Sequence, residues 1–324
     1  MKTTFTRIAV AVSRVLPWII VAFLLIEFAP WCYHFIADRS EPKQFVMYSG
    51  IIEDFAIMDH TGDAPIYTDA KGGSYTEAEF DSILAPFYYR QLMSEERLPD
   101  TLHGVPVSAR FFQTENFTFR SSPSEINKPM VPLYFLLESM SGRVDLSMPD
   151  DVFRITSTGI EFMDMKSNSI NKKKSRTFTE AMQKKGFRFP AKVIAGNGTN
   201  RKDYDNGYLI TDSEGSLYNL KMQRGRPYIR KIETPAELDI RYMFVTEFRN
   251  QRWLGFIIDK DGCFYVLESG SYAIVKTGLP PVNPTETNIS IMGNAFDWTV
   301  SYRNSQGVNR YAINSLNYNL ISTF

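Results

Sequence analysis

The residue types that most often carry out chemistry are sparse in this chain of 324 residues. It has three histidines, His34, His60 and His103, and two cysteines, Cys32 and Cys263. None of them stands in a His-Glu-x-x-His or Cys-x-x-Cys pattern, whose spacing lets several side chains reach one zinc ion. The Gly-x-Ser-x-Gly turn that exposes a serine nucleophile is also missing from the sequence. We therefore predict no catalytic, metal-binding or cofactor-binding residue, and we expect Cys263 to be a buried or half-buried strand thiol.

Carboxylates offer the one enzymatic alternative. Two pairs are close in sequence and are candidates for the acid and base of glycan hydrolysis: Glu138 with Asp145, and Asp150 with Asp151. Such a pair must lie roughly 5–9.5 Å apart across a cleft. A periplasmic hydrolase that acts on glycans is therefore the alternative to a binding protein.

A run of positive charge is the strongest electrostatic feature. Residues 166–202 contain eleven basic residues and one acidic residue, Glu180. Residues 177–180 have the form of a helix capping box, and Gly186 is a helix stop signal. We expect a short helix here, with Phe178, Ala181 and Met182 facing inward and the lysines in solvent. The candidate residues for docking onto anionic head groups or an acidic partner are Lys172, Lys173, Lys174, Arg176, Lys184 and Lys185. A solvated helix and loop without a partner is the alternative.

Residues 15–37 form a long apolar segment, VLPWIIVAFLLIEFAPWCYHFIA, with one formal charge at Glu27. About 20 apolar residues in a helix cross a hydrocarbon core of roughly 30 Å. Residues 1–14 are basic and contain no acid, so the positive-inside rule places them in the cytoplasm and residues 38–324 outside it. We predict an uncleaved single-pass anchor in the bilayer of the inner membrane, with Glu27 as a candidate contact for a partner's helix. A cleaved signal peptide is the rival interpretation, but the bulky residues 31–34 fit a cleavage site badly.

A recurring turn organises the chain beyond the anchor. An apolar strand is followed by Asp or another polar residue, two more residues, glycine, and then an aromatic residue. The turn glycines are Gly72, Gly159, Gly215, Gly262 and Gly307. Such turns close β-hairpins when the glycine is left-handed. Because the later spacings are about 45 residues, we predict a mainly β fold: a propeller-like array of antiparallel four-stranded meanders, preceded by one transmembrane helix. A sandwich or barrel is the alternative.

Short helical insertions interrupt this pattern. Residues 76–79 form a capping box before an apolar helical face, and Pro86 is expected to kink or split the helix that follows. Residues 122–125 suggest one further short turn of helix.

The balance of charge restricts the class of partner. The chain has 36 basic and 36 acidic residues, which argues against a nucleic-acid-binding protein. Beyond the apolar segment the only cysteine is Cys263, so no disulfide is expected within that part of the chain.

Several stretches resemble the bacterial family called domain of unknown function 4857. They are YTDAKGGSYTEAEFDSILAPFYYRQLM, ENFTFRSSPSEIN, LLESMSGRVDLSMPDDVFRIT, GFRFPAK and VTEFRNQRWLGF. The resemblance implies one N-terminal anchor and an exported domain, and it implies components of ABC transporters as companions. It supplies no catalytic residues. We therefore expect a membrane-anchored extracytoplasmic binding or accessory protein, with an ABC transporter permease as the partner class.

Overall fold

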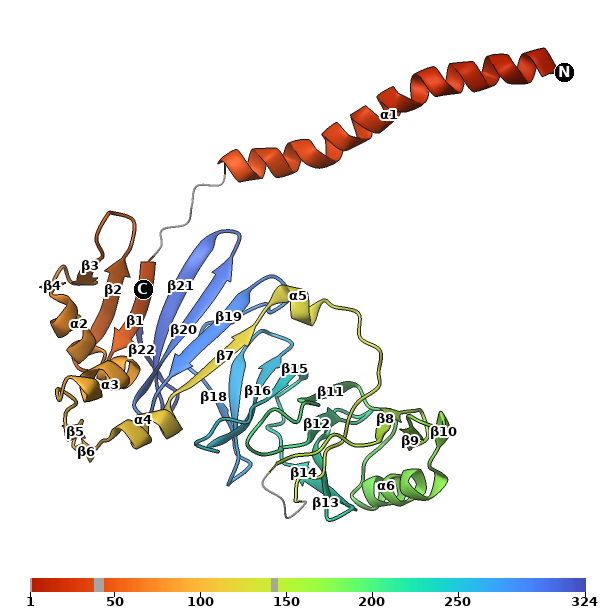
Figure 1. Cartoon of the computed structure of the whole chain (residues 1–324). Helices are drawn as coiled ribbons and strands as arrows, with labels where there is room; N and C mark the ends of the chain where they lie inside the picture. Colours follow the sequence, from red (N-terminus) through yellow and green to blue (C-terminus); the bar gives the residue numbers. More distant parts are fainter. Residues whose placement is uncertain (1, 38–43, 141–144) are drawn as a thin grey trace. The chain divides into compact units, whose positions relative to one another are not determined.

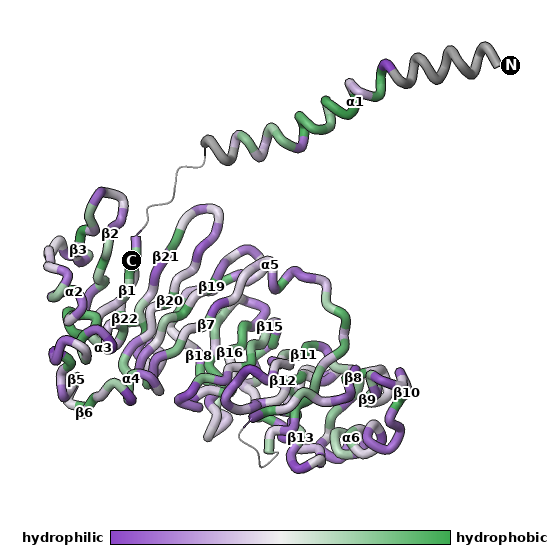
Figure 2. Tube along the Cα trace, in the orientation of Figure 1, coloured by the Kyte–Doolittle hydropathy of each residue, from purple (hydrophilic) through white to green (hydrophobic). Residues whose placement is uncertain are grey.

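The computed structural model describes residues 2–37, 44–140 and 145–324, with the side chains of residues 14–33 and of the last two ranges. The chain divides into two compact units. The smaller unit consists of Met1–Val46 and Ile57–Thr68, and the larger unit consists of Met47–Ala56 and Asp69–Phe324. The smaller unit carries helix α1 (Lys2–Ala37), whose middle is apolar (Figure 2). Its segment Arg14–Tyr33 is long and apolar enough to cross a membrane, and all of that segment is solvent-exposed.

The fold is mainly β, and most of its sheets are antiparallel meanders of consecutive strands (Figure 1). The first sheet contains β1 (Gln44–Ser49), β2 (Asp54–Asp59), β3 (Ile66–Asp69) and β4 (Ser74–Tyr75). Three sheets follow in chain order, and the first of them contains β8 (Asp151–Ile155), β9 (Ile160–Asp164) and β10 (Ser169–Ile170). The next contains β11 (Val193–Gly196), β12 (Tyr208–Thr211), β13 (Leu217–Gln223) and β14 (Arg226–Ile232). The third contains β15 (Ile240–Val245), β16 (Trp253–Asp259), β17 (Phe264–Glu268) and β18 (Ile274–Lys276). The last sheet contains β19 (Asn288–Gly293), β20 (Asp297–Asn304), β21 (Gly307–Asn314) and β22 (Leu320–Thr323), with an earlier strand, β7 (Phe117–Ser121), at its edge beside β19.

In the larger unit, each sheet from β8 onward packs on the next sheet along the chain. One buried cluster joins β8 and β9 to β12–β14, a second joins β12–β14 to β15–β17, and a third joins β16 and β17 to β19–β21. Alternate side chains of a strand point to opposite faces, so the inner sheets supply two clusters at once. On β12, for example, Tyr208 and Ile210 enter the first cluster and Leu209 the second. This successive stacking of meanders is the predicted propeller-like array.

The prediction of antiparallel four-stranded meanders is confirmed for β15–β18 and for β19–β22. The recurring turns have the expected glycine conformation at Gly72, Gly215, Gly262 and Gly307, which have positive φ. The prediction is wrong for Gly159, which is not left-handed. A side chain at that position would instead meet Thr179 Oγ1 at 2.7 Å, so the glycine permits the close approach of a helix.

The aspartate and the aromatic residue of the repeated turn form one hydrogen-bonded unit. In the sheet formed by β15–β18, Asp259 Oδ1 accepts from the backbone amides of Asp261 and Cys263, at 2.9 and 2.8 Å. The Tyr265 hydroxyl donates to Asp259 Oδ2 at 3.0 Å. In the first sheet, Asp69 accepts in the same way from Tyr75, at 2.6 Å, and this bond raises the pKa of Tyr75 to about 12. The spacing Asp-x-x-Gly-x-x-Tyr is therefore structural. Cys263 is half-buried just before β17, as expected.

Short helices fill the interval between the first sheet and β8. They are α2 (Glu77–Ile83), α3 (Ala85–Ser94), α4 (Ala109–Glu115) and α5 (Pro123–Ile126), with a small hairpin of β5 (Thr101–Leu102) and β6 (Val105–Pro106). The capping box at Thr76 and Glu79 is present, and the chain leaves helical geometry at Leu84, just before Pro86. Ser122 and Glu125 also form the expected capping box. These three predictions are confirmed.

Candidate functional site

The predicted basic helix exists, but it starts earlier than its sequence signals indicated. Helix α6 (Lys172–Lys184) begins after Asn171, whose side chain accepts from the Lys174 amide at 3.0 Å. The predicted capping box at residues 177–180 is wrong, because Thr177 lies inside the helix and its hydroxyl donates to the Lys173 carbonyl at 2.9 Å. The predicted end is confirmed: Gly186 follows the helix with φ +86°.

Side chains on the inner face hold α6 against β9. Phe178 and Met182 are 1% exposed, and the Phe178 ring lies 4.7 Å from that of Phe162. Ser175 Oγ accepts from the Phe162 amide at 2.9 Å. Thr179 Oγ1 accepts from the Ile160 amide at 3.1 Å. The expected inward face is confirmed, and these bonds fix the outer face of the helix in one orientation.

Two of the six predicted docking cations are engaged within the protein. Lys174 Nζ lies 2.8 Å from an Asp151 carboxylate oxygen and 4.2 Å from the centroid of the Phe162 ring. Its side chain is only 20% exposed, so the expectation that it points to solvent is wrong. Arg176 remains in solvent but forms an ion pair with Glu180, one turn further along, at 2.7 Å.

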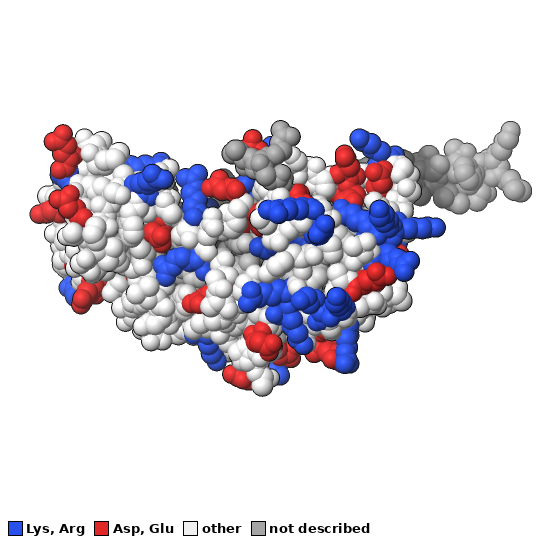
Figure 3. Space-filling view, turned by 90° about the horizontal axis from the view of Figure 1, so that it is seen from below, with Lys and Arg blue, Asp and Glu red and all other residues white. Residues whose placement is uncertain are grey.

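The other four cations are exposed and lack an acidic partner among the described residues. Lys172 and Lys173 occupy the first turn of α6, and Lys184 and Lys185 its end. The structure adds Lys231 to them. It lies two residues after Ile229, a member of the cluster that contains Phe178, on strand β14, which packs against α6. We call Lys172, Lys173, Lys184, Lys185 and Lys231 the basic face. Figure 3 shows basic side chains gathered on the side of the larger unit that carries α6. No local pattern in the sequence marks Lys231, because β14 meets α6 only through tertiary packing.

Three of the four candidate carboxylates of the hydrolase alternative have structural partners. Glu138 accepts from the backbone amides of Arg224 and Gly225, both at 2.7 Å, and so closes the turn between β13 and β14. Asp151 binds Lys174. Asp150 is exposed and lies 3.8 Å from Lys166, and Asp145 is exposed. Glu27 lies on α1, exposed within the apolar segment.

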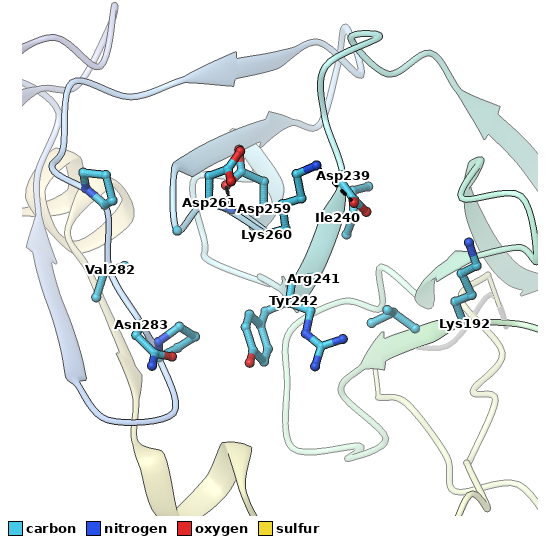
Figure 4. A pocket seen from close by; sticks show the side chains of 14 residues that line it. Lys192, Asp239, Ile240, Arg241, Tyr242, Asp259, Lys260, Asp261, Val282 and Asn283 are labelled. Carbon is cyan, nitrogen blue, oxygen red and sulfur yellow. Dashed lines mark hydrogen bonds and ion pairs between the residues drawn. The ribbon is translucent and has the colours of Figure 1, made fainter.

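A cavity of about 850 Å³ opens beside β15 and the turn between β16 and β17 (Figure 4). Its charged side chains are Lys192, Arg241 and Lys260 against Asp239, Asp259 and Asp261, three of each sign. Lys260 lies 3.8 Å from Asp239, and Asp259 is held by its own turn. Figure 4 shows these side chains spread around a wide space rather than converging on one point. The cavity therefore offers no focused charge to a ligand.

A buried ionic network lies between the loops after β11 and β15. Lys202 Nζ donates to Asp205 at 2.6 Å and to Glu247 at 2.7 Å, and all three side chains are at most 4% exposed. Glu247 also accepts from the Asn206 amide at 2.8 Å. Burial raises the pKa of Glu247 and lowers the pKa of Lys221, a second ammonium that interacts with both carboxylates. The network balances two cations with two anions. Sequence reasoning missed it: Lys202 counted only as part of the basic run.

The described residues hold no group of three or more His, Cys, Asp and Glu side chains placed to bind a metal ion. Residues 45–313 match the family described as "Domain of unknown function (DUF4857)". The chain belongs to this family. The resemblance drawn from sequence is thereby confirmed, and the match includes α6, Lys231 and the buried network. No curated protein matches the DUF4857 chain.

Three solved structures illustrate what this DUF4857 chain is similar to. PorZ, a surface component of the type-IX secretion system of Porphyromonas gingivalis, is 11% identical with a TM-score of 0.27; the match covers 86% of this chain and 26% of PorZ. The N-terminal domain of Nup159 is 12% identical with a TM-score of 0.25, over 82% of this chain and 57% of that domain. The dihydro-heme d1 dehydrogenase NirN is 11% identical with a TM-score of 0.25, over 78% and 65%. Each of these proteins is longer than the matched part, and none bears on the activity of this chain.

Proposed function

We propose that this DUF4857 protein is a membrane-anchored binding protein, an accessory subunit of a transport complex that docks through the basic face. The observation that carries the proposal is the position of Lys172 and Lys173. They lie in the first turn of α6, where the helix dipole disfavours positive charge by about 0.3–1 kcal/mol for each exposed cation. Folding gains nothing from them there, so an acidic partner is the physical reason to keep them.

The anchor supplies the second element of the proposal. α1 holds one apolar segment that is long enough to span a bilayer. A signal sequence can have the same length and composition. The proposal takes it as an uncleaved anchor in the inner membrane, with residues 1–14 in the cytoplasm and the β sheets outside. The family resemblance implies ABC transporter components as companions, so a permease is the partner class we propose.

Topology gives the first test. A reporter enzyme that is active only after export, fused after Phe324, should be active and should remain in the membrane fraction. The reason is that a 20-residue apolar helix holds the chain in the bilayer, with the basic N-terminus retained inside. Release of an active, shortened and soluble fusion would show instead that the segment is cleaved.

Charge reversal on the basic face gives the second test. In K172E/K173E each reversed charge should cost about 1 kcal/mol or more of attraction to an acidic surface. Co-purification of the tagged full chain with a permease or ATPase from native membranes should therefore fall at least tenfold at low salt. The melting temperature should be unchanged or slightly higher, because glutamate suits a helix start.

The matched control is K71E/K128E, which reverses two exposed lysines outside the basic face. It should co-purify like the parent protein. Equal recovery of partner by K172E/K173E and by this control would contradict docking through the basic face. Purification of the parent protein alone, without permease or ATPase, would contradict the accessory role.

A further inference from the structure

A second cavity differs from the cavity of about 850 Å³ in the elements that line it and in the balance of its charged side chains. It has a volume of about 650 Å³ and is lined by α3, by the edge strands β7 and β15, and by the loops that follow β11 and β15. It adjoins a cavity of about 360 Å³, with which it shares Arg90 and Phe117. It also shares Phe119 and Val245 with a mostly apolar cavity of about 440 Å³. We call these three adjoining spaces the cleft.

The central part of the cleft carries an excess of positive charge. Its lining includes four basic side chains, Arg90, Arg201, Lys202 and Arg249, and two acidic ones, Asp203 and Glu247. Lys202 is already paired with Asp205 and Glu247 in the buried network, and Arg249 pairs with Asp203 at 3.1 Å. Within the described part of the chain, Arg90 and Arg201 form no ion pair with an acid. Two arginines are therefore free to bind an anion from solvent.

The surrounding residues limit what that anion is attached to. The Arg90 guanidinium lies 5.6 Å from the centroid of the Tyr89 ring, and its Nε donates to the Tyr89 hydroxyl at 3.0 Å, so one edge of the guanidinium is already oriented. Phe248 lines the same space, with its ring 4.5 Å from that of Phe117. The side-chain amide of Gln113 is exposed in this lining. Aromatic walls with a few polar groups are typical of sites for small organic molecules.

The floor of the cleft is rigid before any ligand binds. Glu247 is fixed by Lys202, by the Asn206 amide and by the Asn197 side chain, which donates to it at 2.9 Å. The Tyr204 hydroxyl donates to the Phe248 carbonyl at 2.9 Å. A pre-formed wall avoids the entropy cost of ordering a site on binding.

We infer that the cleft binds a small organic oxyanion, a molecule whose carboxylate or phosphate group is held by Arg90 and Arg201 and whose remainder lies against Tyr89 and Phe248. The planar guanidinium presents two parallel N–H donors, which match the two oxygens of a carboxylate or phosphate. The site uses no residue of the basic face, so it stands independently of the proposed docking.

The test is calorimetric titration of the full chain in detergent with two pairs of probes. Glucuronate is compared with glucose, and glycerol 3-phosphate with glycerol, so that each pair differs by the oxyanion. At least one charged probe should bind with a dissociation constant in the millimolar range or tighter, and its neutral counterpart should not bind. The preferred pair identifies carboxylate or phosphate as the group recognised.

The variants R90Q and R201Q should each weaken binding of that probe at least tenfold, since each removes a charged hydrogen-bond donor. Both side chains are exposed, so circular dichroism and melting should match the parent protein. The control K172E/K173E, which alters only the basic face, should bind the probe like the parent. Absence of binding by both charged probes at 10 mM, or unchanged affinity in R90Q and R201Q, would overturn the inference.

Discussion

Replacing Lys202 by methionine is expected to lower the free energy of unfolding by about 3–5 kcal/mol, the cost of leaving a buried ion pair without one partner. Asp205 and Glu247 would then face each other inside the protein without the ammonium that both now contact. Methionine has a similar length, so lost packing contributes little. Urea unfolding of the full chain in detergent measures the change.

Two controls separate the loss of charge from a general loss of packing. R249M removes an ion pair whose members are 56% and 63% exposed, and it should cost under about 1 kcal/mol. In the quadruple variant K202M/K221M/D205N/E247Q all four charges of the network disappear together, so most of the stability should return. A K202M protein as stable as R249M would mean that the network is solvated and contributes little.

Stability should also fall as the pH rises from about 4 to 7, and Asp297 should cause part of this fall. Its carboxyl is 4% exposed, and burial raises its pKa from an ordinary 3.8 to about 7, against the hydrogen bond from Asn294. Between these values the folded protein holds a proton that the unfolded chain releases. Folding then takes up a proton, so the free energy of unfolding decreases with pH by up to about 1.4 kcal/mol per unit.

The variant D297N tests this, because asparagine resembles the neutral acid at every pH. Relative to the parent, D297N should gain a few kcal/mol of stability between pH 4.5 and pH 8 in urea unfolding. His103 lines the same small cavity, so H103Q serves as the control for other changes in that cavity. If the stability difference between D297N and the parent is the same at both pH values, the carboxyl of Asp297 is ionised throughout.

The meanders could be predicted from sequence because their signals are local. The signal for each hairpin turn lies within seven residues, from Asp259 to Tyr265 in the clearest copy, and the strands on either side of that turn are apolar. The capping boxes at Thr76 and Ser122 are local in the same sense, since the side chain and its backbone partner are three residues apart. Such features need no knowledge of what packs against them.

The candidate sites could be predicted only in part, because tertiary neighbours decide the role of each charge. Lys172 and Lys174 look alike in sequence, yet Lys174 contacts Asp151 of strand β8 while Lys172 stays in solvent. Lys202 ended the predicted basic run, and one of its buried partners, Glu247, belongs to the loop after β15. Neither Arg90 nor Arg201 stood out, because what singles them out is a shared cavity.

The pairing of β7 with β19 constrains the order in which this protein folds. In that pair Ser121 lies opposite Ile289, so the contact closes a loop of 168 residues, the difference of the two numbers. A contact of such high sequence separation is slow to form, because the entropy of the long intervening chain must be lost first. As the chain emerges from its N-terminal end, residues 117–121 must wait for almost all the rest of the protein before they have a partner. The walls that β7 gives to the cleft are therefore among the last parts to form, and the sheets from β11 to β18 can assemble before them from neighbouring strands.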